Sequence, residues 1–293
     1  MKAWMKGMRL LAAASFVGLA AQAAMATPVY YAYSYTGNGV ASAGIMTVDG
    51  VLTGGHYNIL GMQGSRNAST IGSMLATGAL GGNDNRLYPA GPFVDTAGFS
   101  FTAGSGQYNV GNAAVACGSA SLYGESATGL CGDLVGVSLD VALFTPQAGA
   151  SYFSYSYTGN GVAAAGIFTT SGSAGGPYTI TGITGQRNGL DITALLAAGA
   201  LGGNDNLLDP DEPYVDGAGF SYAVGAARFN VGNANAVCGT TAIYGESATG
   251  SCGDLVSVAM NVTALSVPVP EPQSVLLVGL ALAAAAAARR RRA

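Results

Sequence analysis

Residues 29–37, VYYAYSYTG, lead through Gly37-Asn38-Gly39 into a second apolar stretch that ends with Ile45-Met46-Thr47-Val48. Alternating aromatic residues followed by a Gly-Asn-Gly turn are typical of a β-hairpin. The same eight residues, YSYTGNGV, stand at 33–40 and again at 155–162. This stretch therefore predicts a β-rich fold that the chain carries twice.

The duplication extends across most of the chain. GALGGNDN at 78–85 returns at 199–206, and CGSASLYGESATGLCGDL at 117–134 returns at 238–255 with thirteen of eighteen positions identical. Each copy has about 115 residues, enough for a domain with its own hydrophobic core. We therefore expect two similar modules, residues 27–146 and 147–266. One larger pseudo-symmetric sandwich, with strands from both copies, is the alternative.

Local patterns within each copy favour short antiparallel strands. Stretches at 98–112 and 134–144 alternate with period two, and strands at this spacing favour a sandwich or barrel. Residues 68–80 and 189–201 differ, because their apolar spacing suits a short helix that ends at glycines. The predicted fold class is all-β and mainly antiparallel: two tandem sandwich-like or barrel-like modules with a short helix in each.

Both ends of the chain carry targeting features. Residues 1–26 begin with a basic segment, continue with a short apolar run at 10–20 and end in Ala24-Met25-Ala26. These are the three parts of a signal peptide, which we expect signal peptidase to cut after Ala26. A retained N-terminal anchor is the alternative.

Residues 267–293 form a tail with three parts in order. An apolar run at 274–288 is short and alanine-rich, so we expect a weak transmembrane helix. Arginines at its far end hold that end in the cytoplasm, which places the two modules outside the inner membrane. The residues that flank the run are Val269, Pro270, Glu271 and Pro272 before it, and Arg289, Arg290, Arg291 and Arg292 after it.

This tail resembles the PEP-CTERM sorting signal, which has a Pro-Glu-Pro motif, a hydrophobic helix and a terminal arginine cluster in the same order. The resemblance covers roughly the last 25 residues. It implies a transient inner-membrane anchor, cleavage near Pro270-Glu271-Pro272 by a membrane-embedded exosortase, and delivery to the cell surface or extracellular matrix of a Gram-negative, exopolysaccharide-producing bacterium. An ordinary single-pass anchor is the alternative.

The region between the two ends is acidic. It holds fourteen acids, only four arginines and no lysine, which gives a formal charge of −10. Such a surface repels phosphates, so nucleic acid is excluded as a partner. Neutral sugars, divalent cations and other proteins remain open.

Four cysteines fall two to a copy, as Cys117 with Cys131 and Cys238 with Cys252. In an exported protein this indicates one disulfide in each module. A bridge that closes a loop of this size stabilises a fold by about 3 kcal/mol, and we expect the enclosed YGESATG to become a defined surface loop. Zinc is the alternative, but it needs further ligands, and the only histidine, His56, aligns with Pro177.

Few charged residues occur in both copies. They are the acids Asp84/Asp205, Asp95/Asp216, Glu125/Glu246 and Asp133/Asp254, and the base Arg66/Arg187. Oxygen ligands on a glycine-rich loop can hold Ca²⁺, although Asn and Asp at such positions more often make turns. The candidate cation ligands are Asn83, Asp84, Asn85, Asp95, Asn204, Asp205, Asn206 and Asp216. We expect no other cofactor.

Two further patterns bear on sugar chemistry. Paired carboxylates can hydrolyse glycosides, so Asp84 with Asp95, or Glu125 with Asp133, are candidates for a hydrolase. Aromatic rings on a strand can stack on sugars or fill a core. These rings belong to Tyr30, Tyr31, Tyr33 and Tyr35, and in the second copy to Tyr152, Phe153, Tyr155 and Tyr157.

The sequence favours a non-enzymatic protein, because neither a shared histidine nor a catalytic serine motif accompanies the acids. We expect a surface or matrix protein that binds exopolysaccharide or neighbouring proteins, for instance in a biofilm. An exported polysaccharide hydrolase and a passive coat protein are the alternatives.

Overall fold

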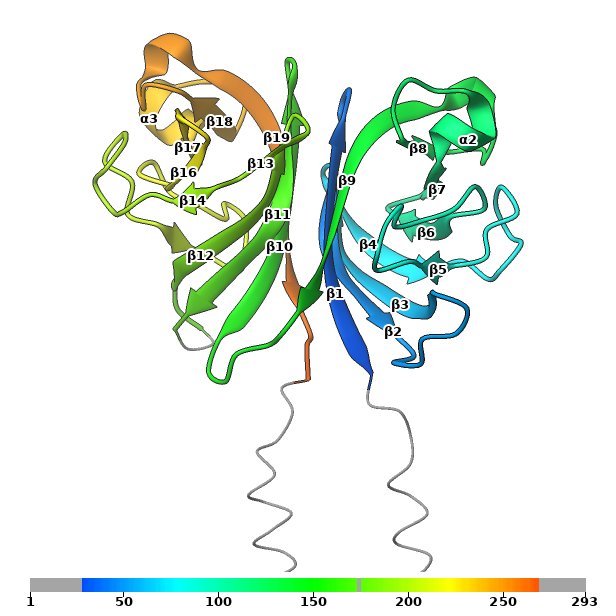
Figure 1. The fold of residues 1–293 in the computed structure, drawn as a ribbon. Helices are drawn as coiled ribbons and strands as arrows, with labels where there is room; N and C mark the ends of the chain where they lie inside the picture. Colours follow the sequence, from blue (N-terminus) through cyan, green and yellow to red (C-terminus); the bar gives the residue numbers. More distant parts are fainter. Residues whose placement is uncertain (1–27, 173–174, 269–293) are drawn as a thin grey trace, which may run out of the picture.

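The computed structural model describes residues 28–172 and 175–268. The predicted signal peptide, the Pro-Glu-Pro motif, the apolar run and the terminal arginines lie outside these residues. The described chain is mainly antiparallel β, as predicted, and Figure 1 shows two curled sheets side by side. The first sheet takes all its strands from the first copy and the second sheet takes all of its strands from the second copy.

The first sheet closes into an eight-stranded barrel. Each strand pairs with its neighbours in the chain, and the pairings of β1 with β9 and of β2 with β3 complete the ring. A two-residue strand, β5, adds to the edge of β3. This up-and-down order leaves few exposed strand edges. The strands are β1 (Val29–Gly37), β2 (Val40–Val48), β3 (Tyr57–Arg66), β4 (Ser69–Met74), β5 (Arg86–Leu87), β6 (Phe99–Ala103), β7 (Gly106–Asn112), β8 (Tyr123–Ser126) and β9 (Val135–Phe144).

The second sheet repeats this order but is interrupted at one point. The strand equivalent to β4 is split at Ile192 and Thr193, so the sheet curls from β13 at one end to β14 at the other. Its strands are β10 (Ser151–Gly159), β11 (Val162–Ser171), β12 (Tyr178–Arg187), β13 (Leu190–Asp191), β14 (Ala194–Leu195), β15 (Leu207–Leu208), β16 (Phe220–Val224), β17 (Ala227–Asn233), β18 (Tyr244–Ser247) and β19 (Val256–Leu265).

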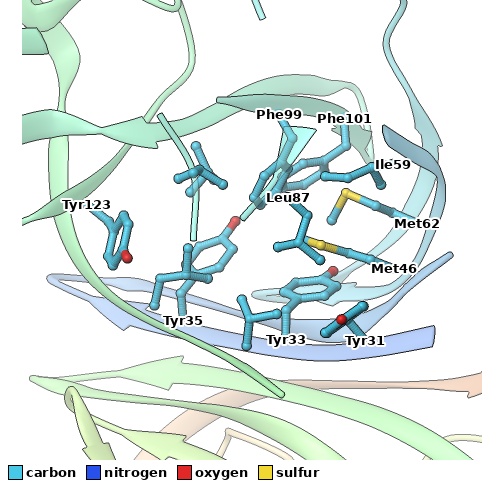
Figure 2. Close-up of a cluster of buried hydrophobic side chains, with 14 of the residues drawn as sticks. Tyr31, Tyr33, Tyr35, Met46, Ile59, Met62, Leu87, Phe99, Phe101 and Tyr123 are labelled. Atoms are coloured by element: carbon cyan, nitrogen blue, oxygen red, sulfur yellow. The ribbon is translucent and has the colours of Figure 1, made fainter. Parts of the chain in front are cut away.

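The predicted hairpin is present, and its aromatic side chains fill the barrel. Gly37 pairs with Val40 around a two-residue turn, and Gly39 takes the positive φ that this turn requires. Alternate residues of β1 point inward, so Tyr31, Tyr33 and Tyr35 are buried (Figure 2).

The equivalent residues of β10 are buried as well. Phe153, Tyr155 and Tyr157 lie in the second core, and Tyr152 is buried between the modules. The suggestion that these rings stack on sugars is therefore wrong for the buried residues, because burying their large apolar area stabilises the two modules instead.

The helices expected at 68–80 and 189–201 are absent. Residues 69–74 form β4, which pairs with both β3 and β6, and only Ile71 of this strand is fully buried. A helix here would leave the facing edges of β3 and β6 unpaired, so barrel closure overrides the local apolar spacing. Within the described residues, short helices occur elsewhere: α2 (Ala113–Cys117), α3 (Ala234–Cys238), and the 3-10 turns Cys131–Asp133 and Cys252–Asp254.

The two sheets pack through their outer faces. Four alanines, Ala41 and Ala43 of β2 with Ala163 and Ala165 of β11, form a buried cluster at the centre. A second cluster beside it joins Ile45, Tyr152, Ile167 and Leu265. We call these eight residues the module interface. Small side chains at its centre let two strands approach closely, which fixes the relative position of the sheets.

Candidate functional site

The shared base and one shared acid form an ion pair on the inner side of each curled sheet. Arg66 Nε donates to Glu125 Oε2 over 2.9 Å, and the Arg66 guanidinium lies 3.5 Å from the centre of the Tyr108 ring. The Tyr35 hydroxyl donates to the same carboxylate. Sequence reasoning singled out Arg66 and Glu125 separately; the structure shows that they are partners.

The second module repeats this arrangement with two changes, because Phe229 stands in the place of Tyr108 and Tyr222 adds a second hydroxyl. Arg187 Nε donates to Glu246 Oε1 over 3.0 Å, and its guanidinium lies 3.8 Å from the centre of the Phe229 ring. The hydroxyls of Tyr157 and Tyr222 both donate to Glu246. Tyr222 replaces a phenylalanine, Phe101, of the first copy.

Electrostatics keep the guanidinium groups of these pairs charged. Burial alone would lower the pKa of Arg66, but the hydrogen bonds and charge of Glu125 outweigh it and raise the pKa above its ordinary value. Burial and then the charge of Glu125 raise the pKa of Tyr35 well above its ordinary value. Neither the guanidinium nor the phenol is therefore suited to release a proton at neutral pH. The ion pair is a structural tie between opposite walls of the barrel.

The disulfides predicted from the cysteine spacing are present. Cys117 and Cys131 are bonded with Cα atoms 5.5 Å apart, and Cys238 and Cys252 with Cα atoms 5.6 Å apart. All four sulfurs are thus engaged, which overturns the zinc alternative.

The segment inside each disulfide differs from the expected surface loop. Tyr123–Ser126 is the strand β8, and all four of its residues are buried. The remainder of the loop is held by Asp133, whose Oδ2 accepts from the backbone N–H groups of Ala127 at 2.8 Å and Thr128 at 3.0 Å. A strand is needed here because β8 joins β7 to β9 in the closed sheet.

Hydrogen bonds set the acidity of Asp133. Slight burial opposes ionisation, but the hydroxyls of Ser126 and Thr128 and the two backbone N–H groups lower the pKa of Asp133 to about 2. Asp254 accepts the same set of bonds in the second copy, and its pKa is lowered as well. This shared acid therefore stabilises the loop inside each disulfide through hydrogen bonds.

The amide side chains of the Asn-Asp-Asn segment mainly form hydrogen bonds that stabilise turns. Asn83 Oδ1 accepts from the N–H of Leu80 at 3.1 Å, and Asn83 Nδ2 donates to the Ala76 oxygen at 3.1 Å. Asn85 Oδ1 accepts from Asn83 Nδ2 at 2.9 Å. Asn204 and Asn206 repeat these bonds. The four amide side chains are buried and hydrogen-bonded to each other and to the surrounding chain, so their first role is to stabilise the turns.

The carboxylates of this segment lie near one another. Asp95 Oδ1 accepts from the N–H groups of Ala97 at 2.9 Å and Gly98 at 3.1 Å, while Asp84 Oδ2 lies 3.2 Å from Arg86 Nη1. Burial and then the charge of Asp95 raise the pKa of Asp84.

The second copy keeps only part of this arrangement. Asp216 Oδ1 accepts from the N–H groups of Ala218 and Gly219, and Asp205 Oδ1 accepts from the N–H of Leu207.

Within the described residues there is no group of three or more His, Cys, Asp or Glu side chains that could hold a metal. A Ca²⁺ ion bound by Asp84 and Asp95, or by Asp205 and Asp216, stays a prediction.

A cleft lies between the two modules, and the sequence did not reveal it. It has a volume of about 650 Å³ and lies where the tips of the two hairpins, the turn at 188–189 and the outer face of β9 converge. None of its lining residues is charged. The polar side chains that line it are Thr36, Asn38, Ser121, Ser138 and Asn188, and the larger apolar ones are Leu122, Val137 and Leu139, with Tyr123 beside them.

The two flanks of the module interface differ. On the flank of β19, Gln63 exchanges two hydrogen bonds with the Ser266 backbone at 2.7 and 2.8 Å, and the Thr70 and Thr263 hydroxyls lie 3.0 Å apart. On the flank of β9, the cleft and a second hollow of about 230 Å³ lie instead. We call these the closed flank and the open flank.

Comparison with known proteins identifies the tail. Residues 268–292 match the family described as the PEP-CTERM protein-sorting motif, which confirms the resemblance. The chain thus carries a PEP-CTERM sorting motif, which implies export, sorting by an exosortase and transient anchoring in the membrane before cleavage. No curated protein and no solved structure matches this chain. None of the helices in the described part of the chain has the length and apolar character needed to span a membrane.

Proposed function

We propose that this exported protein is a non-enzymatic component of the cell surface or extracellular matrix that binds neutral polysaccharide in the cleft between its modules. The observation that carries the proposal is the cleft itself. Its volume of about 650 Å³ falls within the range of small-molecule sites, which is enough for a few sugar units.

The lining of the cleft suits a neutral sugar. Hydroxyl and amide groups from Asn38, Ser121 and Ser138 can bond to sugar hydroxyls, and Leu122, which is 48% exposed, offers an apolar surface to a sugar ring. The cleft lacks a basic side chain and the mature region carries a formal charge of −10, so an anionic polysaccharide would be repelled.

The shared polar residues support a non-enzymatic role. Glu125 is bonded to Arg66 and Tyr35 inside the barrel, and Asp133 is bonded to its own loop. Neither carboxylate lines the cleft. The acids considered for glycoside hydrolysis therefore already have structural partners, apart from the Asp84–Asp95 pair, which lies outside the cleft.

The duplication supplies a matched test. The exposed side chains Asn38 and Leu122 line the cleft, whereas their counterparts Asn160 and Ile243 in the second copy do not. The exported protein and two double variants, Asn38→Ala with Leu122→Ala and Asn160→Ala with Ile243→Ala, are compared by affinity electrophoresis in gels that contain neutral exopolysaccharide from the producing cells.

We expect the cleft variant to bind at least about fivefold more weakly, equivalent to about 1 kcal/mol, and the control variant to bind like the unaltered protein. Equal retention of all three proteins, or no retention of any, contradicts the proposal. Release of reducing sugar ends that stops on Asp84→Asn substitution would instead support the polysaccharide hydrolase.

A further inference from the structure

Both ends of the described chain lie at the same end of the molecule (Figure 1). β1 begins there, β9 and β19 end there, and the loop at 49–56 between β2 and β3 lies there as well. We call this end the base. The hairpin tip at 38–39 and α2 lie at the opposite end.

The chain is held to the folded body up to Val267. Gln63 exchanges two hydrogen bonds with the Ser266 backbone, and Val267 packs against the second cluster of the module interface. Seven further residues reach Ser274, where the apolar run of the sorting motif begins, and they span at most about 25 Å when fully extended. Strand β1 alone, with nine residues, is about 30 Å long. A chain anchored through the apolar run therefore keeps its base near the membrane and its opposite end further away.

The base of the first module carries exposed apolar side chains. Val51 and Leu52, in the loop at 49–56, are 51% and 55% exposed. Leu60 on the outer side of β3 and Leu143 at the end of β9 are exposed as well. Large apolar side chains that gather at one end of a domain indicate a surface that contacts a membrane or another protein.

The second module lacks these side chains at the corresponding positions. Its loop reads SGSAGG at 171–176, and Thr181 and Ala264 stand in the places of Leu60 and Leu143. Because both modules share one strand order, the fold does not require large apolar residues at the base. Their presence in the first module therefore indicates a contact outside the module.

Asp49 limits how deeply the loop can enter a bilayer. Its Oδ1 accepts from the Val51 N–H at 3.2 Å, and its Oδ2 accepts from Asn58 Nδ2 at 2.6 Å. Slight burial opposes ionisation, but these hydrogen bonds outweigh it and lower the pKa of Asp49. A charged carboxylate is costly to move into hydrocarbon, so the loop suits the headgroup region of a bilayer.

We propose that the base of the first module docks on the outer surface of the inner membrane while the tail anchors the chain, with Val51 and Leu52 inserted among the lipid headgroups. The anchoring that the sorting motif implies makes this contact intramolecular. A short tether raises the effective concentration to about the millimolar range, so a weak apolar contact is enough. Cleavage of the tail removes the tether and with it the docking. The cleft lies at the hairpin tips, away from the base, so docking does not depend on sugar binding.

A single tryptophan reports the contact. The anchored form, from membranes of cells that lack exosortase, is reconstituted in phosphatidylcholine vesicles at physiological ionic strength, and the released form is mixed with the same vesicles. Trp4 is the only tryptophan, so all proteins carry Trp4→Phe. Leu52→Trp places the reporter in the loop. Leu130→Trp places it at an exposed site beside the Cys117–Cys131 disulfide, at the opposite end.

Brominated phosphatidylcholine should quench the tryptophan of anchored Leu52→Trp at least about twofold more strongly than that of anchored Leu130→Trp, because interfacial side chains lie about 5–10 Å inside the headgroup boundary. In the released form, both should be quenched weakly and equally. Equal quenching at the two positions in the anchored form overturns the proposal. Blue-shifted emission from Leu52→Trp without quenching would show that another copy of the chain covers the loop, which overturns it too.

Neutron reflectivity of the anchored protein on a supported phosphatidylcholine bilayer needs no reporter. We expect no water layer between the headgroups and the unaltered protein. Val51→Ser with Leu52→Ala, which introduces residue types of the second loop, should open such a layer. Val115→Ala with Leu130→Ser, which introduces the residues of the second copy at the opposite end, should not. A water layer beneath the unaltered protein that Val51→Ser with Leu52→Ala leaves unchanged would contradict the docking.

Discussion

Arg66 in β3 and Glu125 in β8 form an ion pair across the inside of the first barrel, from strands that stand opposite each other in the ring. The pair is shielded by the Tyr108 ring and bonded to Tyr35. Arg187 and Glu246 repeat it in the second module. Because the two partners come from opposite walls, each pair ties together strands that share no backbone hydrogen bonds.

Removing one charge of this pair should destabilise its module. We expect Glu125→Gln to lower the free energy of unfolding by about 3–5 kcal/mol, because Arg66 would keep its buried charge without a carboxylate. Urea unfolding measures the change. Asp211→Asn, which alters an exposed acid, is the control and should leave the free energy of unfolding nearly unchanged. A loss for Glu125→Gln that is no larger than in the control would show that the pair is not a structural tie.

Acid should weaken the disulfide loops over a defined range of pH. The pKa of Asp133 is lowered to about 2 in the folded protein, so between that value and the ordinary value near 4 the unfolded chain binds more protons than the folded one. The stability that Asp133 contributes is therefore present above about pH 4 and is lost as the pH falls toward about 2.

The variant Asp133→Asn isolates this contribution. It should be less stable than the unaltered protein at neutral pH, and the difference should shrink as the pH falls from about 4 to about 2. Urea unfolding at several pH values measures both effects. A difference in stability that stays constant over this range would contradict the assigned role of Asp133.

The alanine cluster at the module interface should tolerate no larger side chain. Ala165 is fully buried against Ala41, Ala43 and Ala163, so Ala165→Leu forces the sheets apart while leaving the core of each module intact. We expect a larger radius of gyration by small-angle X-ray scattering and a loss of about 1–3 kcal/mol in stability. Val237→Leu, on the exposed surface of α3, is the control. An unchanged radius and stability for Ala165→Leu would argue against the observed packing.

Local patterns predicted much of the secondary structure. The Tyr-rich hairpin, the period-two strands and the two disulfides depend on residues close in the sequence, and all are present. The helix expected at 68–80 is wrong because β4 is held by pairing with β6, some thirty residues further along the chain. The spacing of apolar residues within 68–80 does not reveal such a distant pairing. The aromatic residues of β1 were ambiguous for the same reason: alternation alone does not say which face is the core.

The cleft and the open flank could not be predicted from either copy alone, because they arise where the outer faces of two sheets meet. Alanines at 41, 43, 163 and 165 were the available signal, since small residues on the outer face of a strand indicate close packing. The burial of Glu125 was also signalled, as YGES is identical in both copies and Arg66 is the only base that both copies share.

The most direct test of this account is mass spectrometry of the protein recovered from the surface or medium of its producing cells. The sorting motif at 268–292 and the signal peptide predict a chain that begins near Thr27, ends close to Pro270-Glu271-Pro272, lacks Arg289–Arg292 and contains two disulfides. Recovery from the cytosol with both termini intact and four reduced thiols would contradict it.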